Sequence, residues 1–231
     1  MIQISNLSKK YGETVVFSDL NYTFENACIY GLVGRNGAGK TTLLNILSNY
    51  DKNYTGVISI DRKKMNKVDY LDMPVAYAMD QPSFFNELTI YENLLLIASS
   101  RKIKKQEAFD KIERILDGLG LKKYENYSPL ELSKSTMQRL NNACAMIQEE
   151  KITIFDEPFS GLDPVQMKLL ENVIVEFHKK EKGIYIISSH DIECLQNVCD
   201  KCLLLHNGQI REINMEEVDR EEIAKILSEG E

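Results

Sequence analysis

The sequence lacks any long apolar run. Its longest strongly apolar stretch is LLLIA at 94–98, far below the roughly 20 residues that a helix needs to span a bilayer. The first twelve residues, MIQISNLSKKYG, also lack the apolar centre of a signal peptide and are typical of an amphipathic strand. We therefore expect a chain that stays in the cytosol and has no membrane-spanning segment of its own.

Basic residues are also comparatively few. The chain has 28 Lys and Arg against 35 Asp and Glu, which leaves a net charge of -7. Because binding to a phosphate backbone usually needs a basic surface, this balance counts against nucleic acid as a partner.

The hydrophobic share of 43% is that of a globular protein able to bury a sizeable core. A length of 231 residues favours one domain with an inserted subdomain.

Cysteine is sparse and poorly arranged for metal chemistry. Of five cysteines, only Cys199 and Cys202 have a suggestive spacing, in CDKC. Such a pair can form a redox or metal site, but no second CxxC and no nearby histidine pair completes a zinc site. The surrounding residues are typical of a helix end that leads into a strand. We therefore interpret both cysteines as small apolar residues.

Hydrophobic patterning predicts an α/β fold. The first thirty residues alternate apolar and polar, which indicates antiparallel strands. Later strands, separated in part by helices, are predicted at 28–33, 56–60, 75–80, 151–155, 184–188 and 202–206. A helix is expected from about Lys40 to Leu47, and another opens at Asp163-Pro164. Asn207-Gly208 predicts a hairpin. Strands that alternate with helices imply a mainly parallel sheet.

A helical block interrupts this alternation. Thr89 and Glu92 form a capping box, an amphipathic helix covers about 105–117, and a third helix runs from about Ser135 to Gln148. The expected organisation is a single domain, 1–231. The core, which includes the antiparallel strands, covers 1–81 and 151–218. A helical insertion covers 82–150, and a terminal helix or tail covers 219–231.

GRNGAGKT matches the P-loop pattern in full, and it lies between a predicted strand and a predicted helix. Backbone N–H groups of such a loop surround phosphate oxygens at a helix N-terminus. Lys40 supplies a cation for the β- and γ-phosphates, and Thr41 supplies a hydroxyl for Mg²⁺. The expected phosphate-binding residues are Gly34, Asn36, Gly37, Ala38, Gly39, Lys40, Thr41 and Thr42. A P-loop NTPase core is therefore predicted.

Hydrolysis needs a carboxylate for Mg²⁺ and a group that polarises water. The segment ITIFDEP places Asp156 and Glu157 at the end of a buried strand, where ligands of open α/β sheets bind. We expect Asp156 to hold Mg²⁺ and Glu157 to act on the nucleophilic water.

Taken in order, KKYG, GRNGAGKTT, MDQPSFFNELTIYENL, LSKSTMQRL, FDEPFSGLD and SSHD resemble the motifs of the nucleotide-binding subunit of an ABC (ATP-binding cassette) transporter. The resemblance covers nearly the whole chain. It implies that Tyr11 stacks on adenine, that Gln81 senses Mg²⁺ and the water, and that Asp163 lies at a subunit contact. It also implies that His190 bonds the γ-phosphate.

One motif departs from the family. Its members usually have LSGGQ where this chain has LSKST at 132–136. In the family this segment contacts the γ-phosphate of ATP held by the opposing subunit, so Ser133 and Ser135 are candidate contacts. Ser135 with Gln138 is predicted to form a capping box. Either the segment is competent and the protein closes as a homodimer, or it is an impaired half-site that pairs with an intact partner.

The resemblance implies ATP and Mg²⁺ as cofactors, ATP hydrolysis as the activity, and a permease on a separate chain as the partner. The expected place is therefore the cytoplasmic face of the cell membrane.

Phe84, Phe85 and Tyr91 either line a docking groove for that partner or pack the helical insertion. The SK and MQRL features resemble bacterial exporters of antimicrobial peptides and drugs, which favours export. A non-transport ABC ATPase and a regulatory ATP sensor are the alternatives.

Overall fold

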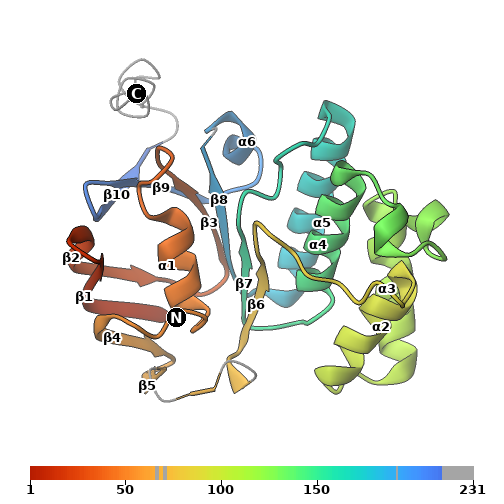
Figure 1. The fold of residues 1–231 in the computed structure, drawn as a ribbon, viewed down its shortest axis with the longest axis horizontal. Coiled ribbons are helices and arrows are strands. Elements are labelled where there is room, and N and C mark those ends of the chain that lie inside the picture. The colour runs from red at the N-terminus through yellow and green to blue at the C-terminus, as the bar shows by residue number, and fades with distance from the viewer. Residues whose placement is uncertain (66–67, 70–71, 191, 215–231) are drawn as a thin grey trace.

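In the computed structural model, two β-sheets enclose one helix, and a layer of further helices covers the outer face of the larger sheet (Figure 1). The structure describes residues 1–65, 68–69, 72–190 and 192–214. The helix or tail predicted at 219–231 lies outside the described residues.

The smaller sheet contains the N-terminal strands, and all of its pairings are antiparallel. It is four-stranded, with the order β2 (Thr14–Phe24), β1 (Ile2–Tyr11), β4 (Thr55–Ile60) and β5 (Lys63–Lys64). Its apolar side chains face α1 (Lys40–Leu47), which lies between the two sheets (Figure 1).

The larger sheet is six-stranded and mainly parallel. Its order is β10 (Gln209–Ile213), β9 (Lys201–His206), β3 (Cys28–Val33), β8 (Ile184–Ser189), β7 (Ile152–Phe155) and β6 (Val75–Ala78). Only β10 runs antiparallel, joined to β9 by the Asn207-Gly208 turn. Both turn residues have positive φ, 49° and 71°, as a tight hairpin of this kind requires. The predicted hairpin is therefore present.

The central strands are buried on both faces because each face is covered by helices. Along β8, Ile184 and Ile186 join the core cluster around α1, whereas Tyr185 and Ile187 join the cluster on the opposite face. Alternation of side chains along a strand divides them in this way, and a parallel sheet with two covered faces needs apolar residues at nearly every position. The apolar runs of the sequence reflect this arrangement.

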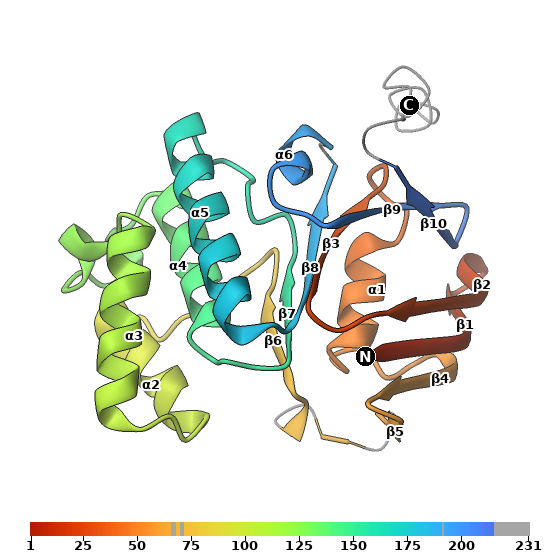
Figure 2. The same cartoon turned by 180° about the vertical axis from the view of Figure 1, so that it is seen from behind.

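The helical layer lies on the far side of the larger sheet (Figure 2). α4 (Lys134–Met146) and α5 (Pro164–Glu181) lie next to the strands, and α2 (Ile90–Ser100) and α3 (Lys105–Gly118) lie outside them. Short helical turns connect or follow them: η2 (Lys122–Tyr124), η3 (Pro129–Glu131) and α6 (Glu193–Gln196). The predicted α/β fold with an antiparallel β part and an inserted helical part is confirmed.

The helix α4 starts close to the expected position, but the predicted capping box of Ser135 with Gln138 was wrong. The helix begins at Lys134, and Ser133 is its N-cap, accepting a hydrogen bond from the backbone N–H of Thr136. Gln138 does not close a capping box on Ser135, because Ser135 lies inside the helix and Ser133 is the N-cap. The side-chain amide of Gln138 instead donates to the backbone oxygen of Glu157 at 3.3 Å, a tertiary contact.

Candidate functional site

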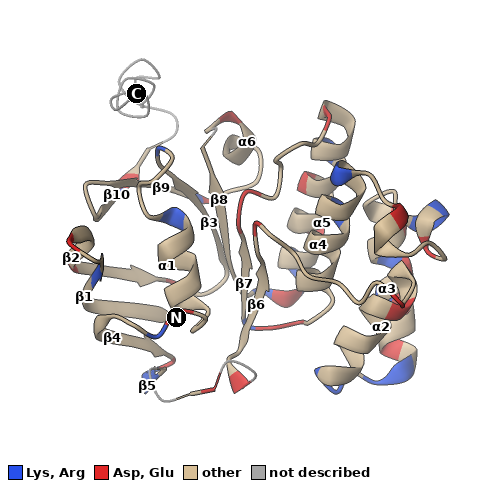
Figure 3. Ribbon diagram, viewed as in Figure 1, with Lys and Arg blue, Asp and Glu red and all other residues tan. Residues whose placement is uncertain are grey.

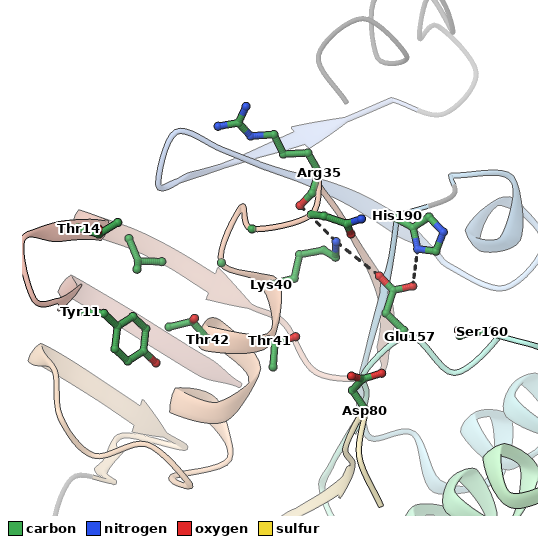
Figure 4. Close-up of a pocket in the computed structure, with 14 residues that line it drawn as sticks. Tyr11, Thr14, Arg35, Lys40, Thr41, Thr42, Asp80, Glu157, Ser160 and His190 are labelled. Carbon is green, nitrogen blue, oxygen red and sulfur yellow. Dashed lines mark hydrogen bonds and ion pairs between the residues drawn. The ribbon is translucent and has the colours of Figure 1, made fainter. Parts of the chain in front are cut away.

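A cavity of about 530 Å³ opens where the larger sheet, α1 and the smaller sheet meet (Figure 4). It lies beyond the carboxyl ends of β3, β7 and β8, the place where open α/β sheets bind ligands. It is lined by Tyr11, Thr14, Val16, Arg35, Asn36, Gly37, Gly39, Lys40, Thr41, Thr42, Asp80, Glu157, Ser160 and His190. The P-loop, Glu157, His190 and Tyr11 are therefore brought together around one space.

The loop from Gly34 to Gly39 has the backbone that an anion site needs. Gly39 has a φ of 100°, and an added Cβ there would lie 2.7 Å from the Val16 side chain, so only glycine is tolerated. No side chain of the described residues caps α1 at Gly39, and its first turn has no acidic residue. Its first N–H groups therefore face the cavity with the positive end of the helix dipole.

Lys40 is held in the cavity by oxygen atoms on several sides. Its Nζ donates to the backbone oxygen of Gly34 at 2.7 Å and lies 3.5 Å from Oε1 of Glu157. The other oxygen of Glu157 lies 2.9 Å from Nδ1 of His190 (Figure 4). Lys40, Glu157 and His190 thus form a continuous chain of charged and polar groups across the cavity.

Asp156 lies beneath this chain and is fully buried. Ser188 donates to its Oδ1 at 2.6 Å, and the side chain of Thr41 also hydrogen-bonds to it. Burial raises the pKa of Asp156 above its ordinary value, against the lowering effect of the hydrogen bonds from Ser188 and Thr41. A carboxylate this deep is most stable as an anion when a cation lies next to it.

The oxygen atoms here fit Mg²⁺. Mg²⁺ prefers hard oxygen ligands and is commonly held by one or two carboxylates together with substrate phosphates. The Thr41 hydroxyl and the Asp156 carboxylate touch each other at the mouth of the phosphate loop. The described residues contain no group of three or more His, Cys, Asp and Glu that could hold a metal alone. A magnesium ion here would need phosphate oxygens as well, as expected for a nucleotide site.

The ring of Tyr11 is fixed from one side. Its hydroxyl donates to Asp51 at 3.1 Å, and the Lys9 ammonium lies 4.4 Å from the ring centroid. Lys9 is itself buried and forms a 2.7 Å ion pair with Asp51. Because Tyr11 remains 52% exposed, the ring offers its open surface to the cavity. An aromatic ring in this position suits a planar base.

Gln81 does not line the cavity, and the role that the resemblance implies for it stays a prediction. It is exposed, and Asp80 takes the position beside the P-loop. The chain bends at both residues after β6 ends, and a step of one residue turns a side chain to the other side. Asp80, Arg35, Thr14 and Ser160 are lining residues that the sequence reasoning missed. Asp80 could have been suspected because it precedes Gln81 at a strand end.

The candidate residues of the opposing-subunit surface lie away from this cavity. Ser133 caps α4, and its Oγ lies 3.3 Å from Ser135 Oγ and 2.8 Å from Thr136 Oγ1. Asp163 caps α5 and forms a capping box with Gln166. None of Ser133, Ser135 and Asp163 lines the cavity. Gly34 and Ala38 of the P-loop do not line it either, and a Cβ added at Gly34 would meet Leu205 and Ala38.

The ABC transporter family profile matches residues 17–160 of the chain, more than half of its length. The chain belongs to the ABC transporter family. It is 31% identical over 90% of its length to an uncharacterised ABC transporter ATP-binding protein, MJ1023, of Methanocaldococcus jannaschii, of which it covers 75%. It is 29% identical over 91% to the tungstate uptake ATP-binding protein TupC of Peptoclostridium acidaminophilum, covering 97% of that protein. It is 30% identical over 95% to the bacitracin transport protein BcrA of Enterococcus faecalis, covering 71%.

Solved structures agree on the fold of this ABC cassette. The ATP-binding subunit of an ABC transporter superposes with a TM-score of 0.84 at 26% identity, covering 98% of this chain and 94% of that one. The cassette MJ0796, solved as a dimer with ADP and phosphate, gives a TM-score of 0.81 at 22% identity over 93% and 98%. The expected family and the ABC transporter ATPase class are thereby confirmed. Among the described residues, no helix is long and apolar enough to cross a membrane.

Proposed function

We propose that the cavity binds Mg·ATP and that Glu157 accepts the proton of the water that attacks the γ-phosphate. The observation that carries this proposal is the chain from Lys40 through Glu157 to His190, placed directly beside an uncapped helix N-terminus. Lys40 and the N–H groups of the loop bind phosphate oxygens. Asp156 and Thr41 hold Mg²⁺, which neutralises charge on the phosphates.

In this proposal each side chain has a separate task. A γ-phosphate beside Lys40 competes with Glu157 for the ammonium, so binding releases one oxygen of Glu157 to face the water. His190 keeps the other oxygen at 2.9 Å and so orients the carboxylate. As water attacks phosphorus, its proton passes to Glu157 and the bond to the β-phosphate oxygen breaks. Tyr11 stacks against adenine, as its exposed ring surface allows.

We further propose that two cassettes close around two ATP molecules. Ser133 and the start of α4 lie outside the chain's own cavity and have the exposed hydroxyl and helix N-terminus that a phosphate of the opposing subunit can meet. Asp163, at the start of α5, is proposed to lie at the same contact. The dimer of the MJ0796 cassette, bound to ADP and phosphate, supports this arrangement.

The proposed membrane partner docks beside the segment that follows β6. There a cavity of about 310 Å³ is lined by Pro82, Ser83, Phe84, Asn86, Pro129, Leu130 and Met137. Leu130 and Phe85 are exposed, at 75% and 58%, so an apolar surface borders this hollow. Phe84 lines the hollow and also packs against the core, whereas Tyr91 is partly buried against the core and does not line the hollow.

Under this proposal the protein is a peripheral subunit on the cytoplasmic face of a membrane, and it powers export. One relative is named for bacitracin transport, without a direction, and another is named for tungstate uptake. Transport of substrate by membrane vesicles that contain the cassette and the multi-span protein encoded beside it decides the direction. Accumulation inside inside-out vesicles supports export, and loss of preloaded substrate from them contradicts it.

The central test compares the wild-type protein with Glu157→Gln. Steady-state phosphate release by the purified wild type, abolished in Glu157→Gln while ATP binding persists, is the expected result. Light scattering at millimolar ATP should show Glu157→Gln as a dimer, because ATP is bound and not hydrolysed. Monomers under these conditions would contradict the homodimer, and dimerisation with a different cassette would then show the heterodimer. Equal phosphate release by both proteins would overturn the role of Glu157.

A further inference from the structure

Ser188 is a fully buried polar side chain in contact with both hydrolytic residues. It lies near the end of β8, next to the end of β7, where Phe155 pairs with Ile187 in parallel register. The register therefore places Ser188 beside Asp156 and Glu157, one step beyond the last pair. The sequence SSH drew attention only to the histidine, and neither the P-loop nor the family motifs explain why a hydroxyl is buried here.

The single hydroxyl of Ser188 makes two hydrogen bonds with opposite roles. Its O–H donates to Oδ1 of Asp156 at 2.6 Å, a length typical of bonds to a carboxylate. Its oxygen accepts from the backbone N–H of Glu157 at 2.9 Å. Because the donor and an acceptor site are both used, the hydroxyl is fixed in one orientation.

The two hydrogen bonds of Ser188 restrain the backbone of Glu157 and the carboxylate of Asp156. Glu157 is a non-glycine residue with a φ of 49°, in the left-handed region, and such a backbone persists only where neighbouring contacts hold it. That backbone aims the Glu157 side chain at Lys40 and His190 (Figure 4). At Asp156, the bond from Ser188 occupies Oδ1 and leaves the other oxygen toward Tyr77, 3.4 Å away.

We propose that Ser188 is a positioning residue that orients Asp156 through its side chain and Glu157 through its backbone. This role rests on the proposed ATPase function of the same site. It assigns to one residue the relative placement of the metal-binding carboxylate and the proton-accepting carboxylate. Loss of the hydroxyl leaves two buried polar groups without this partner, so both carboxylates gain freedom where a fixed geometry is required.

The test uses Ser188→Ala and Ser188→Cys in the full chain, with Thr153→Ala as the control. Cysteine keeps a side chain of similar size but offers only a weak hydrogen bond. Thr153 is an equally buried hydroxyl on β7, away from the cavity. We expect kcat for ATP to fall by about 10- to 100-fold in both Ser188 variants, with KM changed by less than about threefold. Thr153→Ala should retain kcat.

A second readout does not depend on turnover. The extra rise in melting temperature that Mg²⁺ adds to ATP binding should shrink in both Ser188 variants and persist in Thr153→Ala, because Asp156 is no longer oriented. If Ser188→Cys keeps the wild-type kcat and the wild-type effect of Mg²⁺, the proposal is overturned. Wild-type protein that binds Mg·ATP without releasing phosphate would overturn the ATPase function alone, and the effect of Mg²⁺ would still decide the role of Ser188.

Discussion

At the scale of single residues, the smaller sheet carries a buried cation that bears on nucleotide binding. Lys9 joins Asp51, the ring of Tyr11 and the backbone oxygen of Asn53, with its Nζ 2.7 Å from the last. Burial raises the pKa of Asp51, but hydrogen bonds from Lys9, the Asn53 backbone and Tyr11 outweigh it, and the pKa lies below its ordinary value. The ionised form of Asp51 is thus favoured by folding.

Asp51→Asn should therefore lower stability in a pH-dependent way. A carboxyl whose pKa is lower in the folded state contributes stability that is fully present above its unfolded value of 3.8. That contribution is lost as pH falls through the lower folded-state pKa. Melting temperatures from pH 7 to pH 2.5 should show a wild-type advantage that disappears below the unfolded value.

Asp69→Asn is the matched control for Asp51→Asn, because Asp69 forms a 3.8 Å ion pair with Lys52 but is 88% exposed. Exposed pairs contribute only about 0 to 1 kcal/mol, so little change is expected at any pH. An advantage of the wild type over Asp51→Asn that stayed constant down to pH 2.5 would show that the Asp51 charge is not the cause.

At the scale of elements, α4 connects two functional surfaces. Its N-terminus carries Ser133, while three amides on one face donate to main-chain oxygens of the core. Gln138 bonds Glu157 at 3.3 Å, Asn141 bonds Met79 at 2.7 Å and Asn142 bonds Pro158 at 3.2 Å. The helix that carries the altered motif is thereby fixed against the segments that follow β6 and β7. Its position, and not only its first turn, determines where Ser133 points.

The double substitution Lys134→Gly/Ser135→Gly restores the usual family sequence at these two positions. We expect ATP hydrolysis to stay within about threefold of wild type, a barrier change below about 1 kcal/mol. The N–H groups and the Ser133 hydroxyl are already present, and Lys134 is exposed. Stability should fall by about 0.5 to 1 kcal/mol per glycine. Steady-state phosphate release and thermal melting measure the two effects.

Lys134→Ala serves as the control, since it removes the long side chain without adding a glycine. A rise in hydrolysis of tenfold or more in the double-glycine variant would show that the present segment is an impaired half-site. The heterodimer would then be the favoured assembly. If Lys134→Ala alone produced the rise, the lysine side chain would be the obstacle.

At the scale of the whole molecule, a buried lysine joins the helical layer to the core. Lys111 of α3 is 1% exposed and bonds Glu149, before β7, at 2.7 Å and Glu181, at the end of α5, at 2.9 Å. Three segments distant in the sequence therefore meet at one ammonium. Elsewhere the two signs of charge are interspersed over the elements (Figure 3).

Lys111→Met should destabilise the whole chain, because it leaves the partly buried carboxylate of Glu181 and the exposed carboxylate of Glu149 without their cation. Removal of one member of a buried ionic cluster costs about 3 kcal/mol, which corresponds to a fall in melting temperature of roughly 6 to 12 °C for a chain of this size. Lys180→Met tests an exposed pair on α5, with Glu176, and should change the melting temperature by less than about 3 °C. Equal effects of the two substitutions would contradict a special role for Lys111.

Local chemistry allowed much of this architecture to be predicted. The P-loop, the caps at Thr89 and Asp163 and the Asn207-Gly208 turn follow from residues within a few positions of each other, so they are as expected from sequence. The fold class followed from alternation of strands and helices. The N-cap of α4 could not be assigned in the same way, because Ser133 and Ser135 are both good caps, and the structure uses Ser133.

The sequence by itself thus determined the family and the P-loop pattern, and it pointed to the proposed hydrolytic pair, because these depend on residue types at fixed spacing. Only the tertiary structure decided that Asp80 and not Gln81 lines the cavity, that Lys9 and Asp51 fix Tyr11, and that Ser188 holds Asp156 and Glu157. Each of these contacts joins separate strands or loops. Their geometry depends on strand register and burial, which a linear pattern of residues does not contain.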